Sequence, residues 1–193
     1  PSVSQGGLTD KYNFVQLHFH WSSDPKKGGS EHLINSKRFA AEMHLVHYNT
    51  KYSSFADATN HPDGLAVLGV MLDSNVGADH EGFAKIVQEA PSLAEAGAEK
   101  TLTNSLSLKD LLPNNLSTFY RYDGSLTTPK FAEIVTWTVF DNPIPVSESQ
   151  VAVLNQLKDH ENKPLTDNYR EVQPLNGRKI FYYNPSKIAS KQA

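Results

Sequence analysis

The chain has no cysteine among its 193 residues, so disulfide bonds cannot hold its fold together. No apolar run approaches the length of a membrane span, and the first residues show no signal-peptide pattern. The 18 basic and 21 acidic side chains leave a net charge of −3, which gives no electrostatic reason to expect a nucleic-acid partner. Internal repeats, glycine-rich phosphate loops and shifts in composition are also missing, so we expect a single domain over residues 1–193.

Histidine is the residue type that points to chemistry. His18 and His20 are separated by a single residue in the run 14–21, and His44 lies in the run 41–47. Residues two apart in a β-strand point to the same side, so His18 and His20 would share a face. His44, from a neighbouring strand, would complete a site with three histidines. Three protein ligands leave zinc a fourth position for water, which is typical of catalytic rather than structural zinc.

The strand faces support this interpretation. In the first run one face is apolar throughout, whereas the other is largely polar and reads Phe14, Gln16, His18, His20. Gln16 therefore lies beside His18, and Glu42 lies beside His44 on the second strand. Zinc-binding histidines usually donate their second ring N–H to such a partner. A lone histidine is more often structural, but three histidines with matched partners predict a metal site.

The other five of the eight histidines have simpler interpretations. His61 lies in a turn by composition, and His80 and His160 lie in polar stretches. His47 is on the face opposite His44 and is expected to be a buried, hydrogen-bonded core residue. His32 follows a glycine turn. A metal role for His32 stays open, but a structural hydrogen bond is favoured.

Several motifs resemble those of the α-class carbonic anhydrases of the animal cytosolic type, and they occur in the same order along the chain. The similarity covers nearly the whole chain, from about residue 6 to about residue 183, and several multi-residue motifs have the right spacing. The segments that carry it are 16–21, 29–32, 41–47, 124–129, 135–137, 145–150, 168–170 and 173–178.

The resemblance implies a role for each matching polar residue. The zinc ligands would be His18, His20 and His44, and the groups that orient them would be Gln16, Glu42 and the Asn168 backbone. The catalytic pair would be Thr127 and Glu31. An ionised carboxylate only accepts hydrogen bonds, so Glu31 would take the Thr127 proton and leave a threonine lone pair facing zinc-bound hydroxide.

The resemblance also implies a substrate site and a reaction. Carbon dioxide would rest against an apolar wall, and Thr127 and Thr128 would help to hold bicarbonate. The wall would consist of Val46, Val67, Leu126, Val135 and Trp137. The implied activity is the zinc(II)-dependent, reversible hydration of carbon dioxide by zinc-bound hydroxide, with sulfonamides or anions as inhibitors and a monomer as the working unit. Secreted relatives often carry a cysteine where this chain has Phe131, so the absence of cysteine favours the cytoplasm.

The expected fold is mainly β with short peripheral helices, built on a large, twisted, mostly antiparallel sheet. Residues 65–72 and 134–140 read as strands, and residues 81–90 and 92–99 as short helices separated by a proline. Residues 147–150 form a capping box that opens a further helix, with Val151, Leu154 and Leu157 as its apolar stripe. The tail 186–193 is expected to fray.

Two departures from the family pattern bear on activity. Gly6 and Gly7 match a point well inside the family's domain, so its N-terminal portion, with the usual histidine proton shuttle, would be absent. Lys130 replaces a second proline that is often preceded by a cis bond in the family. A non-proline cis bond costs about 2.5–4 kcal/mol, so we expect a trans Pro129–Lys130 bond with a local loop adjustment.

Two other interpretations stay open. One is a relative without zinc that keeps the fold as a binding module, although such proteins lose a ligand histidine and all three are present here. The other is a zinc-loaded but poorly active truncated form that acts as a binding or scaffold protein. Metal analysis and carbon dioxide hydration, both measured on the purified chain, would separate these possibilities.

Overall fold

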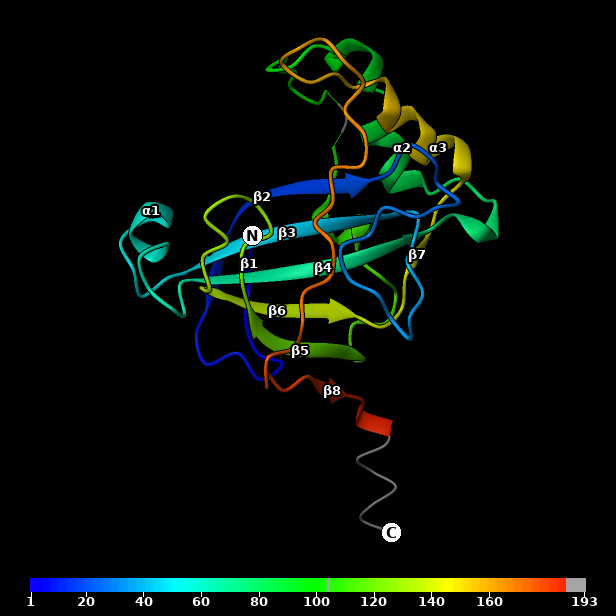
Figure 1. The fold of residues 1–193 in the computed structure, drawn as a ribbon. Coiled ribbons are helices and arrows are strands. Elements are labelled where there is room, and N and C mark those ends of the chain that lie inside the picture. The colour runs from blue at the N-terminus through cyan, green and yellow to red at the C-terminus, as the bar shows by residue number, and fades with distance from the viewer. Residues whose placement is uncertain (104, 187–193) are drawn as a thin grey trace.

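A computed structural model describes residues 1–103 and 105–186. Within them the protein is mainly β, with eight strands in one curled, mixed sheet (Figure 1). The strand order is β1-β2-β3-β4-β6-β5-β8, and β7 pairs with β4. The strands are β1 (Ser2–Val3), β2 (Tyr12–Trp21), β3 (Ala41–Asn49), β4 (Leu65–Asp73), β5 (Phe119–Gly124), β6 (Val135–Phe140), β7 (Ile144–Pro145) and β8 (Phe181–Tyr183).

The sheet is mostly antiparallel, as the sequence predicts. Its parallel pairs among the described strands are β4–β6 and β4–β7. The strand predicted over 65–72 is β4, and every one of its residues is buried. The strand predicted over 134–140 is β6. These buried runs therefore lie side by side in the middle of the sheet.

The helices are short and lie at the edges of the sheet. They are α1 (Phe55–Ala58), α2 (Glu81–Val87) and α3 (Glu148–Val153), with 3₁₀ turns η1 (Ser74–Val76), η2 (Ala90–Leu93), η3 (Leu108–Leu111) and η4 (Leu154–Gln156). The helix predicted over 81–90 ends at Val87, and the helix predicted over 92–99 is wrong. Only η2 forms there, and Gly97 adopts a left-handed φ of 79°. This segment is largely exposed and has no apolar face to bury, so little stabilises a short helix.

The capping box predicts the start of α3 correctly. The Ser147 hydroxyl accepts the Gln150 N–H at 3.1 Å, and the Gln150 side chain accepts the Ser147 N–H at 3.2 Å. Val151 and Leu154 are buried, and Leu157 packs against the same core. The predicted apolar stripe is therefore confirmed. Of the tail expected to fray, residues 187–193 lie outside the described part of the chain.

Two apolar clusters lie on opposite faces of the sheet. Alternate residues of β4 divide between them, with Leu68 in the first cluster and Val67 in the second. The first cluster includes residues of α2 and α3. On the second face, the segment from the end of η4 to β8 crosses the sheet (orange in Figure 1). That segment brings Asn168 to the end of β2, where its backbone N–H donates to the Trp21 carbonyl at 3.2 Å.

A β-bulge in β2 places Phe14 on the opposite face of the sheet from the one predicted. The register with β3 shifts between Phe14 and Gln16, so Phe14 pairs with His47 and Gln16 pairs with Val46. Phe14 consequently packs in the first cluster, edge-on to the His47 ring at 5.6 Å. The prediction that Phe14 shares the face of His18 is wrong, because the extra residue reverses the alternation before Gln16.

Candidate metal centre

Strands β2 and β3 bring the three predicted histidines together. His18 lies directly opposite His44 in the antiparallel register, and His20 lies opposite Glu42. The possible ligand atoms of His18, His20 and His44 all lie within 4.8 Å of one another. The Nε2 atom of His20 is 3.1 Å from Nδ1 of His44. The two strands thus place three imidazoles around one point.

The remaining ring nitrogens of these histidines face hydrogen-bond acceptors. His18 Nδ1 lies 2.9 Å from Gln16 Oε1, and His20 Nδ1 lies 2.9 Å from the Asn168 carbonyl oxygen. His44 Nε2 lies 2.7 Å from Glu42 Oε1. Each imidazole therefore donates its outer N–H and turns the lone pair of its inner nitrogen toward the common point.

The donor set fits zinc. Burial lowers the pKa of His18 to about 3 and of His44 to about 4, so both rings are neutral at pH 7 and have a lone pair for a metal. A tetrahedron with Zn–N bonds of about 2.0–2.1 Å has edges of about 3.3 Å. The 3.1 Å separation of the His20 and His44 nitrogens is close to that edge.

A second group of possible ligands, formed by His32, Glu42 and His44, overlaps the first. Glu42 is fully buried. Its Oε1 atom accepts from His32 at 2.6 Å and from His44, and its Oε2 atom accepts the backbone N–H groups of Glu31 and His32 at 2.9 and 2.8 Å. A carboxylate has about four acceptor sites. The protein occupies all of them, so this group serves to orient His44.

The hydrogen-bond chain behind His44 extends to β5. The Tyr122 hydroxyl lies 2.5 Å from His32 Nε2, so His32 connects Tyr122 to Glu42. Burial alone would raise the pKa of Glu42, but His32 and His44 hold it well below its usual range. Glu42 is therefore ionised and can accept both imidazole N–H groups. The structural hydrogen bond favoured for His32 is confirmed.

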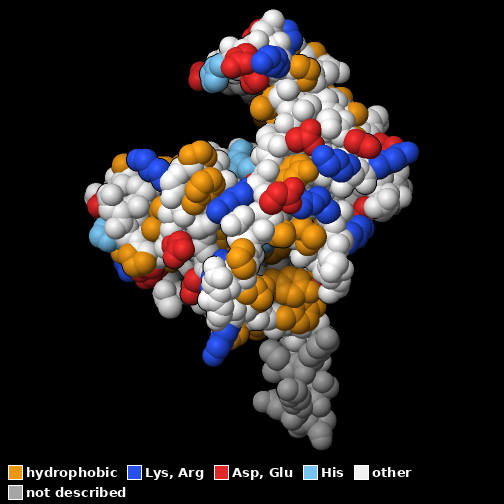
Figure 2. Space-filling model, viewed as in Figure 1, with side chains coloured by type: hydrophobic (Ala, Val, Ile, Leu, Met, Phe, Trp, Pro, Cys, Tyr) orange, Lys and Arg blue, Asp and Glu red, His pale blue; other side chains and the backbone are white. Residues whose placement is uncertain are grey.

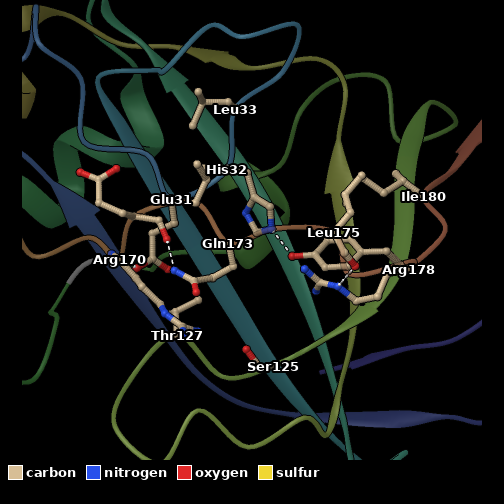
Figure 3. Close-up of a pocket in the computed structure, with 13 residues that line it drawn as sticks. Glu31, His32, Leu33, Ser125, Thr127, Arg170, Gln173, Leu175, Arg178 and Ile180 are labelled. Atoms are coloured by element: carbon tan, nitrogen blue, oxygen red, sulfur yellow. Dashed lines mark hydrogen bonds between the residues drawn. The ribbon is translucent and has the colours of Figure 1, made fainter.

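Glu31 and Thr127 border a cavity that reaches His32 but is not lined by His18, His20 or His44. This cavity has a volume of about 220 Å³, and Figure 3 shows Glu31 and Thr127 on one side of it and His32 and Arg178 on the other. Glu31 Oε1 accepts the Arg170 backbone N–H at 2.7 Å, whereas buried Oε2 has no hydrogen-bond partner among the described residues. Burial raises the pKa of Glu31, and His20, the Arg170 N–H and the Thr127 hydroxyl oppose that rise.

The predicted apolar wall forms one cluster beside the histidines. Its members Val46, Val67, Val135 and Trp137 are buried, and Leu126 packs against them. The Trp137 ring meets the His44 ring edge-on, with centroids 4.7 Å apart, so the wall adjoins the candidate metal position. Thr128 is exposed, and its carbonyl accepts the Phe131 N–H at 2.9 Å. Among described residues no hydrogen bond joins the Thr128 side chain to the histidines.

The other histidines lie away from this centre. His47 is buried on the opposite face and its Nδ1 donates to the Leu45 carbonyl at 3.0 Å, as predicted. His80 caps α2 by accepting the Phe83 N–H at 3.1 Å. His61 stacks on a tyrosine at the surface, and His160 is exposed.

Comparison with known proteins decides the family. A family model described as eukaryotic-type carbonic anhydrase matches residues 1–184. The chain belongs to this family. Carbonic anhydrase 15 of Mus musculus is 42% identical over 93% of this chain and 57% of its own length. Carbonic anhydrase 6 of Bos taurus is 38% identical over 88% of this chain and 54% of its own length. Putative carbonic anhydrase 5 of Caenorhabditis elegans is 40% identical over 97% of this chain and 59% of its own length. The chain thus spans little more than half the length of these relatives.

The loop that carries Thr127 departs locally from this carbonic anhydrase family's sequence pattern. No cis peptide bond occurs among the described residues, so the expectation of a trans Pro129–Lys130 bond is confirmed. The adjustment is visible in the two residues that follow Pro129. Lys130 and Phe131 have left-handed φ values of 80° and 44°. The loop closes through the Leu126 N–H, which donates to the Ala132 carbonyl at 3.0 Å.

Sequence reasoning on this carbonic anhydrase-like site missed three contacts. They are the Tyr122 hydroxyl on His32, the Arg170 N–H on Glu31, and the Asn168 side chain, whose Oδ1 accepts the Trp21 N–H at 2.8 Å. The Arg170 and Asn168 contacts come from the segment that crosses the sheet. Local sequence carries no signal for which crossing residues meet which strand.

Proposed function

We propose that this chain catalyses the reversible hydration of carbon dioxide to bicarbonate and a proton, with zinc held by His18, His20 and His44. The observation that carries the proposal is the convergence of three oriented imidazoles beside an apolar wall, in a chain of this family. Bound zinc would lower the pKa of a coordinated water to about 7, an effect for which carbonic anhydrases are the standard example, so hydroxide becomes available as the nucleophile at neutral pH.

The residues around the metal position would fix its geometry. Gln16, the Asn168 carbonyl and Glu42 each accept one outer imidazole N–H. Each bond selects the tautomer that faces its lone pair inward and restrains rotation of the ring. A preformed tripod loses little entropy when the ion arrives, which favours tight binding.

Thr127 and Glu31 would orient the nucleophile. The Oε2 atom of Glu31 is buried without a partner among the described residues, so it has a free acceptor for a nearby hydroxyl. When Glu31 is ionised it can only accept, and the Thr127 proton is then directed toward it. The lone pairs of Thr127 remain for a donor on the metal side.

The apolar wall would hold the substrate. Carbon dioxide is uncharged, so the surfaces of Val46, Val67 and Trp137 can hold it without a charged partner. Leu126 and Val135 complete the wall. Bicarbonate is charged and polar, and the hydroxyls of Thr127 and Thr128 would supply its hydrogen bonds.

Stopped-flow measurement of carbon dioxide hydration tests the proposal. The zinc-loaded chain should hydrate carbon dioxide faster than buffer alone, and removal of zinc with a chelator should abolish the rate. Because the chain spans little more than half of its relatives, a zinc-loaded but poorly active binding protein is the second candidate. Full zinc occupancy without a hydration rate above buffer would overturn the first candidate and leave the second.

A primary sulfonamide should bind to the zinc-loaded chain. Its ionised nitrogen could take the fourth position on zinc and donate its remaining hydrogen to Thr127, whose lone pairs face the metal in this proposal. Calorimetry on zinc-loaded and zinc-free protein would measure the difference. Equal heats with and without zinc, or no heat with zinc bound, would contradict the proposed arrangement of Thr127.

Replacing Tyr122 with phenylalanine should speed the release of zinc. The variant loses the hydroxyl that holds His32 against Glu42, so His44 is less firmly oriented. A direct hydrogen-bond partner of a metal ligand typically contributes about 10–100-fold to metal affinity. Tyr122 is two hydrogen bonds further from His44 than Glu42 is, so we expect only a several-fold faster release of zinc. Transfer of zinc to a chelator measures the rate. Tyr120→Phe is the matched control on β5, since Tyr120 faces Asp141 instead. Equal rates in the two variants would contradict the role of Tyr122.

We also propose that the protein is located in the cytoplasm and is a monomer. The absence of cysteine supports the location. Among the described residues no helix is long and apolar enough to cross a membrane. Cell fractionation with an antibody to the chain would test the location, and sedimentation would test the oligomeric state.

A further inference from the structure

A second cavity lies on the face of the sheet opposite the histidines. It has a volume of about 510 Å³. Most of its lining is apolar, and it comes from the N-terminal segment 1–8, from β3, β4, β5 and β6, and from the η3 region. The residues that matter here are Leu45, Leu68, Leu108, Leu112, Phe119 and Phe140. Leu45 and Leu68 belong to the first apolar cluster, so this cavity opens into a different core from the metal centre.

Several polar side chains interrupt this lining, and the three that come from the sheet are His47, Arg121 and Thr138. Arg121 on β5 lies directly opposite Thr138 on β6. Its Nε and Nη2 atoms both donate to Thr138 Oγ1, at 3.2 and 2.9 Å. Thr138 is only 4% exposed, so it is a fixed acceptor within the sheet. The guanidinium also lies over the Phe119 ring, 5.4 Å from its centroid.

Arg121 forms no close ion pair in the described part of the chain, although the charge of Asp123, two residues away on β5, favours its charged form. No carboxylate there lies within ion-pair distance, and Thr138 is the one side chain found to accept from the guanidinium. A guanidinium has five N–H donors and stays charged. A half-buried charge of this kind is stabilised by an anion that can take its free donors. Burial lowers the pKa of Arg121, which agrees with incomplete solvation.

We propose that this cavity binds an amphipathic carboxylate, such as a medium-chain fatty acid, with its carboxylate on Arg121 and its alkyl chain along the leucines. A carboxylate matches the planar guanidinium and can accept two parallel N–H bonds. The volume lies within the range of about 300–1,000 Å³ that is usual for small-molecule sites, and apolar walls with few polar groups are typical of them. The ligand would therefore be selected by its negative charge at Arg121 and by the apolar surface of its alkyl chain along the leucines.

Calorimetry with octanoate and decanoate, below their micelle concentrations, tests the proposal on the intact chain. Binding should be saturable with one ligand per chain, and affinity should rise several-fold with each added methylene that is buried. Decanol has the same chain without the charge and should bind at least about tenfold more weakly. Decylammonium should not bind. Equal affinity for decanoate and decanol would show detergent-like adsorption and overturn the proposal.

Three variants assign the binding to Arg121. Arg121→Gln should lose at least about tenfold in decanoate affinity, whereas Arg121→Lys should retain part of it because the charge remains. Lys109→Gln removes the same charge from an exposed position of η3 and should leave the affinity unchanged. Circular dichroism melts would show that each variant is folded. Unchanged affinity in folded Arg121→Gln would overturn the proposal, as would absence of decanoate binding to the unmodified chain. In that second case an acidic segment of a polypeptide would be the better occupant.

Discussion

Replacement of His44 by alanine is expected to abolish tight zinc binding. His44 supplies one of three nitrogens around the common point, and two imidazoles cannot complete the tripod. The loss of affinity should exceed the roughly 10–100-fold cost of losing a hydrogen-bond partner of a ligand. Metal analysis after gel filtration, with chelator competition for the affinity, measures the effect. The unmodified chain should retain one zinc, and the variant should retain none.

Two further variants make this result specific. His160→Ala changes an exposed histidine outside both groups of possible ligands and should keep one zinc. His18→Ala should lose zinc as His44→Ala does, because His18 belongs only to the group with His20. Full zinc occupancy in His18→Ala would place the metal with His32 and Glu42 instead, and would contradict the proposed ligand set.

Replacement of Thr127 by alanine should lower the hydration rate about 10²–10³-fold while zinc content stays the same. That range is the usual cost of removing one preorganised hydrogen-bonding group from an active site. The variant would lose both the donor to Glu31 and the acceptor that faces the metal. Stopped-flow rates at saturating buffer, measured with zinc content on the same samples, separate catalysis from metal loss.

Neighbouring substitutions provide the control for Thr127. Thr127→Ser keeps the hydroxyl and should stay within about tenfold of the unmodified rate. Thr128→Ala removes a hydroxyl from an exposed position and should have the smaller effect of the two alanine variants. A Thr127→Ala rate equal to that of the unmodified chain would show that Thr127 does not orient the nucleophile.

Much of the arrangement around the metal position can be predicted from sequence, because it depends on short-range rules. The two-residue period of a strand places His18 beside His20 and Gln16, and it places Glu42 beside His44. The antiparallel pairing of β2 with β3 then brings the histidines of the two strands together, with His18 opposite His44. The capping box before α3 is similarly local, since its partners are three residues apart.

The features that sequence reasoning missed depend on distant parts of the chain. The bulge before Gln16 reverses the face of Phe14, and nothing in the local alternation marks it. The parallel pairing of β4 with β6 depends on how the intervening segment returns to the sheet. Tyr122 reaches His32 only because β5 lies beyond β6 in the strand order. The helix expected over 92–99 fails for a different reason, because helix propensity without an apolar face does not stabilise so short a segment.

The central claim is that one zinc ion lies between His18, His20 and His44. Crystals of the zinc-loaded chain, measured at the zinc absorption edge, would locate the ion by its anomalous scattering. The account predicts one strong peak about 2.0–2.1 Å from Nε2 of His18, Nε2 of His20 and Nδ1 of His44. A peak beside His32 and Glu42 instead, or no peak in crystals whose zinc content is one per chain, would contradict it.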